Sequence, residues 1–421
     1  MTRRVLIVVQ NLPVPFDRRV WLEATTLTAA GWQVSVISPK ARGYETGHEV
    51  IEDIHVYRYG VPVDAQGRLG FVAEFVWCFL ATSLLSLRVA LWGRGFDVLH
   101  ICNPPETYFP LAWFWRLFGK VFIFDHHDLS PEMYAVKFGG GGGWTMRALR
   151  TMERLTFQAA QLVITTNQSH KEIAVGRGGK RAEDVYIVRS GPDMARFSRY
   201  PRTAAFSRGK PFLIAYLGEI CKQDGVDHLV RAMRILSRQV GRGDVHCIFI
   251  GGGPHQPAIA AYARSLGLDD VTTFTGRVSD DDLCRILSSA DLGIDPDPKN
   301  DWSDKSTMNK VMEYMYFGLP VVAYDLKETR VSAGEAGLYA TPNDEEALAI
   351  AIGGLLDDPV ARHRMGKIAE RRVQETLAWR HSAPILLEAY ERAEALLQRQ
   401  EPTPKSLGPA VTHSDKGAPQ P

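Results

Sequence analysis

A glutamate inside an apolar stretch is the first residue in this sequence with the surroundings of a binding group. Apolar residues from Val311 to Tyr316 recur at the spacing of one helix face, and Glu313 lies among them. A carboxylate there is costly unless hydroxyl groups, such as those of a ribose or a sugar, donate hydrogen bonds to it. The alternative is a surface helix on which Glu313 faces water, because charged side chains are mostly exposed.

The two ends of this predicted helix carry further information. Gly318 is placed to end the helix, Pro320 follows it, and Val321–Ala323 predicts a short strand. Near Ser306 and Thr307, free backbone N–H groups and the positive end of the helix dipole suit a phosphate. One helix could therefore hold both the phosphate and the sugar of a single nucleotide sugar.

A histidine follows a predicted strand at the point where parallel sheets bind their ligands. His127 comes just after Val121–Asp125, at the carboxyl end of that strand. Its imidazole could hydrogen-bond a sugar hydroxyl or a departing phosphate oxygen. The alternative is a structural histidine held by Asp125 or Asp128, a description that fits the neighbouring His126 better.

Composition and spacing exclude several other kinds of chemistry. The formal net charge of +1 gives no electrostatic case for binding nucleic acid. The five cysteines are scattered and form no CxxC pair, which indicates a reducing compartment, predicted to be the cytoplasm, and no structural zinc. No carboxylate pair of the glycosidase type and no metal-ligand spacing is visible, and Asp295-Pro-Asp297 is interpreted as a loop.

Two series of alternating strands and helices position these residues. A chain of 421 residues predicts two domains. We assign residues 1–198 to the first and 209–378 to the second, with a polar linker between them. The strands are predicted at residues 5–9, 32–38, 50–59, 97–102, 121–125, 162–166 and 184–189, and then at 212–217, 245–250, 271–275, 292–295 and 321–323. This α/β pattern predicts two doubly wound Rossmann-like domains facing across a cleft, a last helix over 379–400 and a disordered tail over 401–421.

Several short motifs resemble one family. The C-terminal half is similar to the nucleotide-binding domain of GT-B glycosyltransferases, specifically glycosyltransferase family 4. The matching stretches are Ala215–Asp227, Ile250–Pro254, Phe274–Ser279, Ser289–Gly293, Asn309–Tyr314 and Gly318–Val322. The first half resembles the branch that builds bacterial cell-surface polysaccharides, through Asp17–Glu23, Asp97–His100, Asp125–Asp128 and Ser190–Asp193. The resemblance implies a GT-B fold whose last helix returns to the first domain.

The same resemblance implies roles for particular residues. The donor-binding set is Gly218, Lys222, Gly252, Gly253, Arg277, Val278, Lys305, Thr307, Asn309, Lys310 and Glu313. Within this set, Glu313 binds the ribose and the main chain up to Val278 receives the base. Lys222, Lys310 and the helix start near Thr307 are the candidates for the diphosphate, with no metal. The catalytic candidate is His127, which reaches the transferred sugar, and the acceptor-side residues are Asp17, Arg18 and Arg19.

Two departures from the family pattern affect the donor site. Lys305 stands where the family has the first of two glutamates, and either Asp301 or Asp304 could replace that glutamate at the sugar. Glu219 and Asp224 stand where the family commonly has an arginine and a lysine on the diphosphate. The identity of the donor sugar and of the base is therefore open.

The resemblance implies a metal-independent, retaining glycosyltransferase of the hexosyltransferase type that needs no cofactor. It would move a sugar from a nucleotide-sugar donor to a saccharide or a polyprenyl-diphosphate-linked acceptor in cell-surface polysaccharide biosynthesis. The alternatives are a nucleotide-sugar epimerase of the same architecture and, because of Lys305, a non-catalytic sugar-nucleotide binder. The matches at Asn309–Tyr314 and Gly318–Val322 favour the transferase.

The segment Phe71–Trp92 is apolar enough to raise the question of a membrane. Glu74 and Arg88 bracket thirteen uncharged residues, which predicts a stretch too short to span a bilayer. One interpretation is a buried or partly buried helix of the first domain. The other is an interfacial helix, with Trp77 and Arg94 among the groups that would meet an anionic inner membrane surface.

Overall fold

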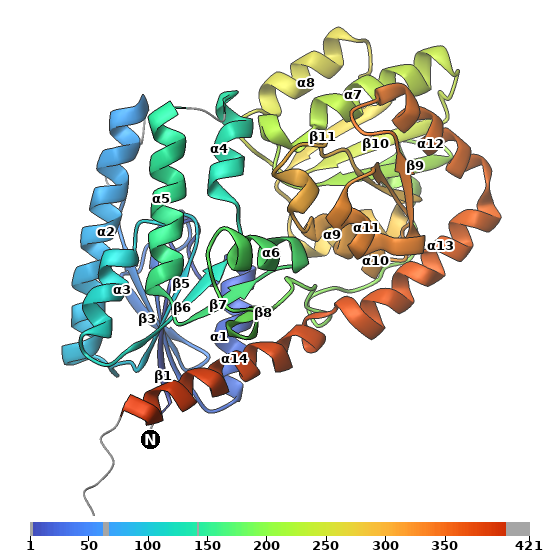
Figure 1. Ribbon diagram of the computed structural model, residues 1–421. Helices are drawn as coiled ribbons and strands as arrows, with labels where there is room; N and C mark the ends of the chain where they lie inside the picture. Colours follow the sequence, from blue (N-terminus) through green and yellow to red (C-terminus); the bar gives the residue numbers. More distant parts are fainter. Residues whose placement is uncertain (1–2, 62–66, 141–142, 401–421) are drawn as a thin grey trace, which may run out of the picture.

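Two sheets organise the chain in the computed structural model, which describes residues 3–61, 67–140 and 143–400 (Figure 1). The first sheet has the strand order β3-β4-β2-β1-β5-β6-β7-β8, and the second has the order β11-β10-β9-β12-β13-β14. All strand pairs are parallel except β3 with β4. The predicted pair of doubly wound α/β sheets is thereby confirmed. The predicted tail, residues 401–421, lies outside the described residues.

The strands of the first sheet lie close to their predicted positions. They are β1 (Arg4–Val8), β2 (Gln33–Pro39), β3 (His48–Ile51), β4 (Ile54–Tyr59), β5 (Val98–Cys102), β6 (Val121–His126), β7 (Leu162–Thr165) and β8 (Val185–Ile187). The apolar runs of β1, β5, β6 and β7 are explained by burial on both faces. The single strand predicted over residues 50–59 is wrong, because Glu52 and Asp53 turn the chain with φ of 49° and 64° and create the antiparallel edge strand β3.

Helices cover both faces of the first sheet. They are α1 (Arg18–Ala29), α2 (Gly67–Trp92), α3 (Phe109–Arg116), α4 (Ser130–Phe138), α5 (Gly143–Ala159) and α6 (Gln168–Gly176). One core forms between the sheet, α1 and the C-terminal helix, and the other between the sheet, α2, α3 and α5. Figure 1 shows α2, α3 and α5 together on the same side of the sheet. The sequence did not predict α4 or α6.

The second domain repeats this alternation. Its strands are β9 (Phe212–Leu217), β10 (Val245–Ile250), β11 (Thr272–Gly276), β12 (Leu292–Asp295), β13 (Val321–Tyr324) and β14 (Gly337–Ala340). Its helices are α7 (Val226–Arg234), α8 (Gln256–Ser265), α9 (Asp280–Ser289), α10 (Asn309–Tyr316), α11 (Lys327–Ala333), α12 (Glu345–Asp357) and α13 (Pro359–Arg372). Gly318, with φ of 74°, ends α10 as predicted, whereas α11 and β14 are additional. Phe197, just before the linker, and Phe206, within it, pack on the core of this domain.

The last helix, α14 (Trp379–Gln400), returns to the first domain as predicted (Figure 1). Leu386, Ala389, Tyr390 and Ala393 recur at helical spacing and are buried against the first sheet and α1. The indole Nε1 of Trp379 also donates a hydrogen bond of 2.9 Å to Thr26 Oγ1. The chain thus crosses between the domains a second time at this helix.

Helix α2 packs along one side and exposes the other. Cys78, Thr82, Ser86 and Val89 face the sheet and are buried. Only 22% of the window Val72–Trp92 is buried, and in the described part of the chain this is the one helix whose length and composition would allow it to cross a membrane. Length and composition alone would thus allow this stretch to span a bilayer, while its packing agrees with the interpretation of a partly buried helix of the first domain. Because its packed side belongs to the first domain, α2 forms an outer layer of that domain.

Candidate functional site

Helix α10 places Glu313 in a mostly buried position between two arginines. The side chain is 17% exposed, and its Oε1 lies 3.7 Å from Arg18 Nη1 and 3.9 Å from Arg196 Nη1. Burial raises the pKa of Glu313, while the two guanidinium groups lower it. The alternative of an exposed surface helix is wrong, because four of its eight residues are buried in the second core. A carboxylate kept at the edge of a core in this way can accept hydrogen bonds from ligand hydroxyl groups.

The N-terminus of α1 reaches from the first domain toward this carboxylate. Arg18 Nη2 donates to Asp280 Oδ1 at 3.2 Å, and Arg196 Nε donates to Asp280 Oδ2 at 2.6 Å. Nearby, the guanidinium of Arg277 lies over the ring of Phe16, 4.9 Å from its centroid. The structure therefore places Arg18, which the resemblance assigned to the acceptor side, beside the expected ribose contact.

The glycines of the second domain pack two loops backbone to backbone. A Cβ atom at Gly251 would lie 1.9 Å from the carbonyl oxygen of Gly218, and one at Gly253 would lie 2.5 Å from that of Ile220. The N–H of Gly218 donates to Ile250 O at 3.0 Å, and the N–H of Ile220 donates to Gly252 O at 2.9 Å. Gly252 has more room, since the nearest atom to its Cβ would be Arg277 Cγ at 3.6 Å. These loops leave backbone open to close approach at Gly252.

Lys310 is held by buried carboxylates beneath the Gly218 loop. Its Nζ donates a short hydrogen bond to Asp297 and lies 3.4 Å from Asp295 Oδ1. Burial lowers the pKa of Lys310, but Asp297 and the neighbouring groups outweigh it and raise the pKa well above its ordinary value. Asp295 is the last residue of β12 and Asp297 lies in the loop that follows, and both carboxylates are buried. A cation shared between two carboxylates is already neutralised before any diphosphate arrives.

The remaining predicted donor residues are spread around the start of α10. Lys222 and Asn309 are exposed, and Val278 is partly buried. Lys305 Nζ donates to Asp301 O at 3.0 Å. Thr307 Oγ1 accepts a hydrogen bond of 3.0 Å from Asn167 Nδ2 of the first domain. Helix α10 begins two residues later than predicted, at Asn309, without a side-chain cap, so its first N–H groups suit an anion.

His127 is the histidine that faces the carboxylate of Asp125. Its Nδ1 lies 3.2 Å from Asp125 Oδ2 and its side chain is 17% exposed. Burial lowers the pKa of His127, but the Asp125 carboxylate raises it above its ordinary value. The expectation that Asp125 or Asp128 holds His126 is wrong, since side chains alternate along β6 and His126 Nε2 instead lies 3.6 Å from Glu153 Oε1.

Asp17 and Arg19 occupy positions that explain their side chains without an acceptor. Asp17 caps α1, accepting from the N–H of Val20 at 3.2 Å. Arg19 is buried and forms two hydrogen bonds with Asp125, Nε to Oδ2 at 3.0 Å and Nη2 to Oδ1 at 2.8 Å. The guanidinium thus fixes the carboxylate that faces His127, through the bidentate geometry typical of this pair.

A buried group of metal-ligand types lies under His127 and was missed by the sequence analysis. One donor atom each from Glu23, His100, Cys102 and Asp125 lies within 4.8 Å of the others. The sequence gives no metal spacing here because its members come from α1, β5 and β6. Arg19 Nη2 lies 3.1 Å from Glu23 Oε1 and also binds Asp125, so a guanidinium already balances these carboxylates. Burial raises the pKa of Glu23 and of Cys102, which favours their protonated forms over metal binding.

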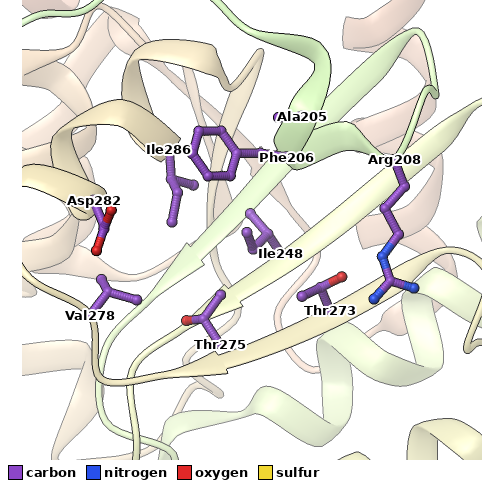
Figure 2. Close-up of a pocket in the computed structure, with 9 residues that line it drawn as sticks. All are labelled: Ala205, Phe206, Arg208, Ile248, Thr273, Thr275, Val278, Asp282 and Ile286. Atoms are coloured by element: carbon purple, nitrogen blue, oxygen red, sulfur yellow. The ribbon is translucent and has the colours of Figure 1, made fainter.

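A separate pocket of about 250 Å³ lies in the second domain (Figure 2). Phe206 of the linker and Ile286 of α9 face Ile248 of β10 and the two threonines of β11, with Arg208 at one end and Asp282 at the other. Of the predicted site residues only Val278 lines it. The pocket is therefore distinct from the groups around Glu313 and His127.

Comparison with known proteins assigns both halves of the chain. A family described as glycosyl transferases group 1 matches residues 211–358, and one described as glycosyl transferase 4-like domain matches residues 17–190. The fold and site define a GT-B glycosyltransferase. The chain belongs to glycosyltransferase family 4.

Relatives and solved structures agree with this assignment. The glycogen synthase of Mycobacterium tuberculosis is 25% identical over 292 residues, 68% of this chain and 67% of that protein. An MMP alpha-(1->4)-mannosyltransferase of Mycolicibacterium hassiacum is 28% identical over 328 residues, 74% of this chain and 75% of that protein. The sucrose-phosphate synthase of Thermosynechococcus elongatus superposes with a TM-score of 0.72 at 20% identity, over 93% of this chain and 99% of that chain. HepE from Anabaena in complex with UDP-glucose has a TM-score of 0.66 at 16% identity, over 94% and 99%.

Replacing Glu313 with alanine should weaken binding of the donor nucleotide with little change in stability. The loss expected for hydrogen bonds to a charged acceptor is roughly 1.5–3 kcal/mol. Isothermal titration calorimetry with nucleoside diphosphates measures it directly. Tyr316→Phe, on the same helix, is the control. The Tyr316 hydroxyl donates to Phe197 O and does not contact Glu313. Equal affinity in Glu313→Ala and the wild type would remove Glu313 from the ribose site.

Proposed function

We propose that this glycosyltransferase is a retaining, hexose-transferring enzyme. It moves a sugar from a nucleotide-sugar donor to a saccharide or polyprenyl-diphosphate-linked acceptor in cell-surface polysaccharide biosynthesis. The observation that carries the proposal is the placement of α1 between the two key groups. Arg18 reaches the carboxylate of Glu313, and the neighbouring Asp17 lies close enough to His127 for their charges to interact. A nucleoside at Glu313 would thereby bring the transferred sugar toward His127.

The main chain near Arg277 and Val278 would receive the base of the donor. No side chain there assigns its identity. HepE was solved with UDP-glucose, which supports starting with uridine diphosphate sugars. A thermal-shift panel that also contains ADP-, GDP- and dTDP-sugars would identify the donor. In the donor complex, His127 presents Nε2 to the sugar or to the departing phosphate oxygen, since its Nδ1 faces Asp125.

The reaction is tested by incubating the donor with and without an acceptor. A transferase forms a new glycoside only when the acceptor is present, and NMR of the anomeric proton reports whether the donor configuration is retained. Conversion of the donor alone into an isomer would identify an epimerase of the same architecture. A protein that binds the donor but neither transfers nor hydrolyses it would be a sugar-nucleotide binder, and this outcome too would refute the proposal.

Activity should survive EDTA. The diphosphate would be neutralised by Lys222 and by the N-terminal N–H groups of α10, so no divalent cation is required. Initial rates with excess EDTA should stay within about twofold of the untreated rates, because no catalytic electrostatic group is removed. Complete loss of activity that Mg²⁺ or Mn²⁺ restores would instead assign a metal role to the carboxylates of the site.

The outer layer of the first domain supports a peripheral position on a membrane. Large apolar side chains of α2, α3 and the adjoining helix ends are exposed: Val72, Phe75, Val76, Trp77, Leu80, Leu84, Leu91, Trp92, Trp113, Phe114, Leu117, Phe118, Phe138 and Trp144. An exposed apolar surface of this extent is typical of an interaction site. Arg88 and Arg116 are exposed among these residues, and Arg147, Arg150 and Arg154 add an exposed basic stripe on α5. We infer a cytoplasmic enzyme that docks on the anionic inner face of the membrane.

The protein should therefore sediment with vesicles that contain anionic lipid at low salt, and less with neutral vesicles. Each basic residue near the surface contributes about 1 kcal/mol, so Arg88→Glu with Arg94→Glu should weaken binding by at least ~10-fold. High salt should weaken it as well, because the Debye length falls. Arg238→Glu with Arg264→Glu, on the second domain, is the control. A protein that stays in the supernatant with anionic vesicles at low salt would refute membrane docking.

A further inference from the structure

A chain of buried polar groups connects the returning helix α14 to His127. Tyr390 Oη lies 2.8 Å from His100 Nδ1, and His100 Nε2 lies 3.8 Å from Asp125 Oδ2. The same Oδ2 lies 3.2 Å from His127 Nδ1. Tyr390, His100 and Asp125 are at most 1% exposed, so these groups are shielded from bulk solvent. The path runs from α14 through β5 to β6 and ends at the carboxyl edge of the sheet.

The surroundings of His100 make it important which ring nitrogen carries the proton. Its Nε2 faces two carboxylates, Asp125 and Glu23, whose Oε2 is 3.7 Å away. Within the described residues, His100 Nε2 and Glu23 Oε2 are buried without a hydrogen-bond partner, and Glu23 Oε1 has only the ion pair with Arg19 Nη2 at 3.1 Å. Buried polar atoms of this kind cost stability in a core. Their presence beneath a proposed catalytic group points to a functional reason rather than to packing.

A hydroxyl donor at Tyr390 and the two carboxylates favour the same tautomer of His100, with Nδ1 as the acceptor and the proton on Nε2. When Tyr390 donates its proton to Nδ1, the imidazole proton resides on Nε2 and points toward Asp125 and Glu23. Without that donor the proton can move to Nδ1, and the Nε2 lone pair would then face two carboxylates, which is unfavourable. The tautomer therefore affects how the Asp125 carboxylate is held, and Asp125 in turn orients the His127 ring.

We propose that Tyr390 is a positioning residue for His127, acting through the tautomer of His100 and the carboxylate of Asp125. The inference rests on the proposed role of His127 at the transferred sugar. It also gives the returning helix a part in the reaction, because α14 supplies the hydroxyl group on which the arrangement depends.

The charges around His127 determine the sign of the expected effect. Asp17 and Arg19 face His127 from the N-terminal end of α1, and Asp125 faces it from β6. On α6, a charge on His127 lowers the pKa of His170. Asp125 is the group that outweighs burial and raises the pKa of His127. A less firmly held Asp125 carboxylate should stabilise the imidazolium less, so the pKa of His127 should fall.

The test compares Tyr390→Phe with Leu386→Val. Phenylalanine keeps the ring that meets Trp32 edge-on at 4.9 Å and removes only the hydroxyl, whereas Leu386→Val disturbs the same buried side of α14 without touching a polar group. NMR of ¹⁵N-histidine protein, with the His127 signals assigned from His127→Gln, gives the pKa of His127. We expect it to fall by roughly 0.5 in Tyr390→Phe, as for loss of one hydrogen bond in the network. It should not change in Leu386→Val.

Activity measurements separate this inference from the proposed function. Tyr390→Phe should lower kcat severalfold and leave the KM for the donor unchanged. An unchanged pKa of His127 in Tyr390→Phe, with the same loss in Tm as Leu386→Val, would show that Tyr390 only packs. If Tyr390→Phe does not fold, His100→Gln provides the same measurement. Full activity of His127→Gln would instead refute the proposed role of His127 at the transferred sugar and leave the transferase function standing, while the pKa comparison would still decide whether Tyr390 positions His127.

Discussion

Deleting residues 379–421 should leave no soluble, active protein. Helix α14 buries Trp379, Leu386 and Tyr390 in the core of the first domain, together with two alanines. Each large side chain contributes about 1.5–3 kcal/mol by burial. Their combined loss is comparable with the whole stability of a domain, roughly 5–15 kcal/mol. The deletion would also expose the apolar face of α1 and the sheet, and it would remove the second connection between the domains.

The matched control is a shorter truncation that ends at Gln400 and lacks only residues 401–421. It should express, melt and turn over the donor as the full chain does. Soluble yield, circular dichroism and transferase rate measure both truncations side by side. A protein that ends before Trp379 and is still folded and fully active would contradict the view that α14 completes the first domain.

The fold was predictable because its signals are local and repeated. Buried parallel strands are continuous apolar runs, so β1, β5 and β6 are visible in the sequence. Helices end at glycine where a positive φ is needed, as at Gly318. Helices α4 and α6 were missed because they are short and carry polar residues on much of their surface. The turn at Glu52 and Asp53 was missed because Asp53 is its one turn-type residue and apolar residues flank the pair on both sides.

The site was predictable only where one residue carries the signal. Glu313 stands out because a carboxylate interrupts an apolar helix face. The partners of a buried charge come from distant parts of the chain, and no spacing reveals them. Arg19 meets Asp125 across 106 positions, and Tyr390 meets His100 across 290. The pairing of Lys310 with Asp295 and Asp297 was missed although they lie nearby in the chain, because their spacing does not show that the side chains meet.

Lys310→Met should destabilise the second domain strongly. The substitution keeps most of the side-chain volume but leaves Asp295 and Asp297 without their cation in a position where both are buried. Leaving such charges unpaired costs about 3–5 kcal/mol. A loss of that size corresponds to a decrease in Tm on the order of 10 °C for a domain of this length. Lys367→Met is the control, because Lys367 is largely exposed beside Glu370.

The destabilisation by Lys310→Met should depend on pH. Burial raises the pKa of Asp297, and Lys310 lowers it, so removal of the lysine should raise it further. A carboxyl group whose pKa is higher in the folded than in the unfolded state stabilises the fold while it is protonated, and that contribution is lost as pH rises through the folded-state value. The destabilisation of Lys310→Met should therefore be smaller at low pH than at pH 8, and addition of Asp297→Asn should recover part of it. A variant with the wild-type Tm at both pH values and only weaker nucleotide binding would place Lys310 on the diphosphate instead.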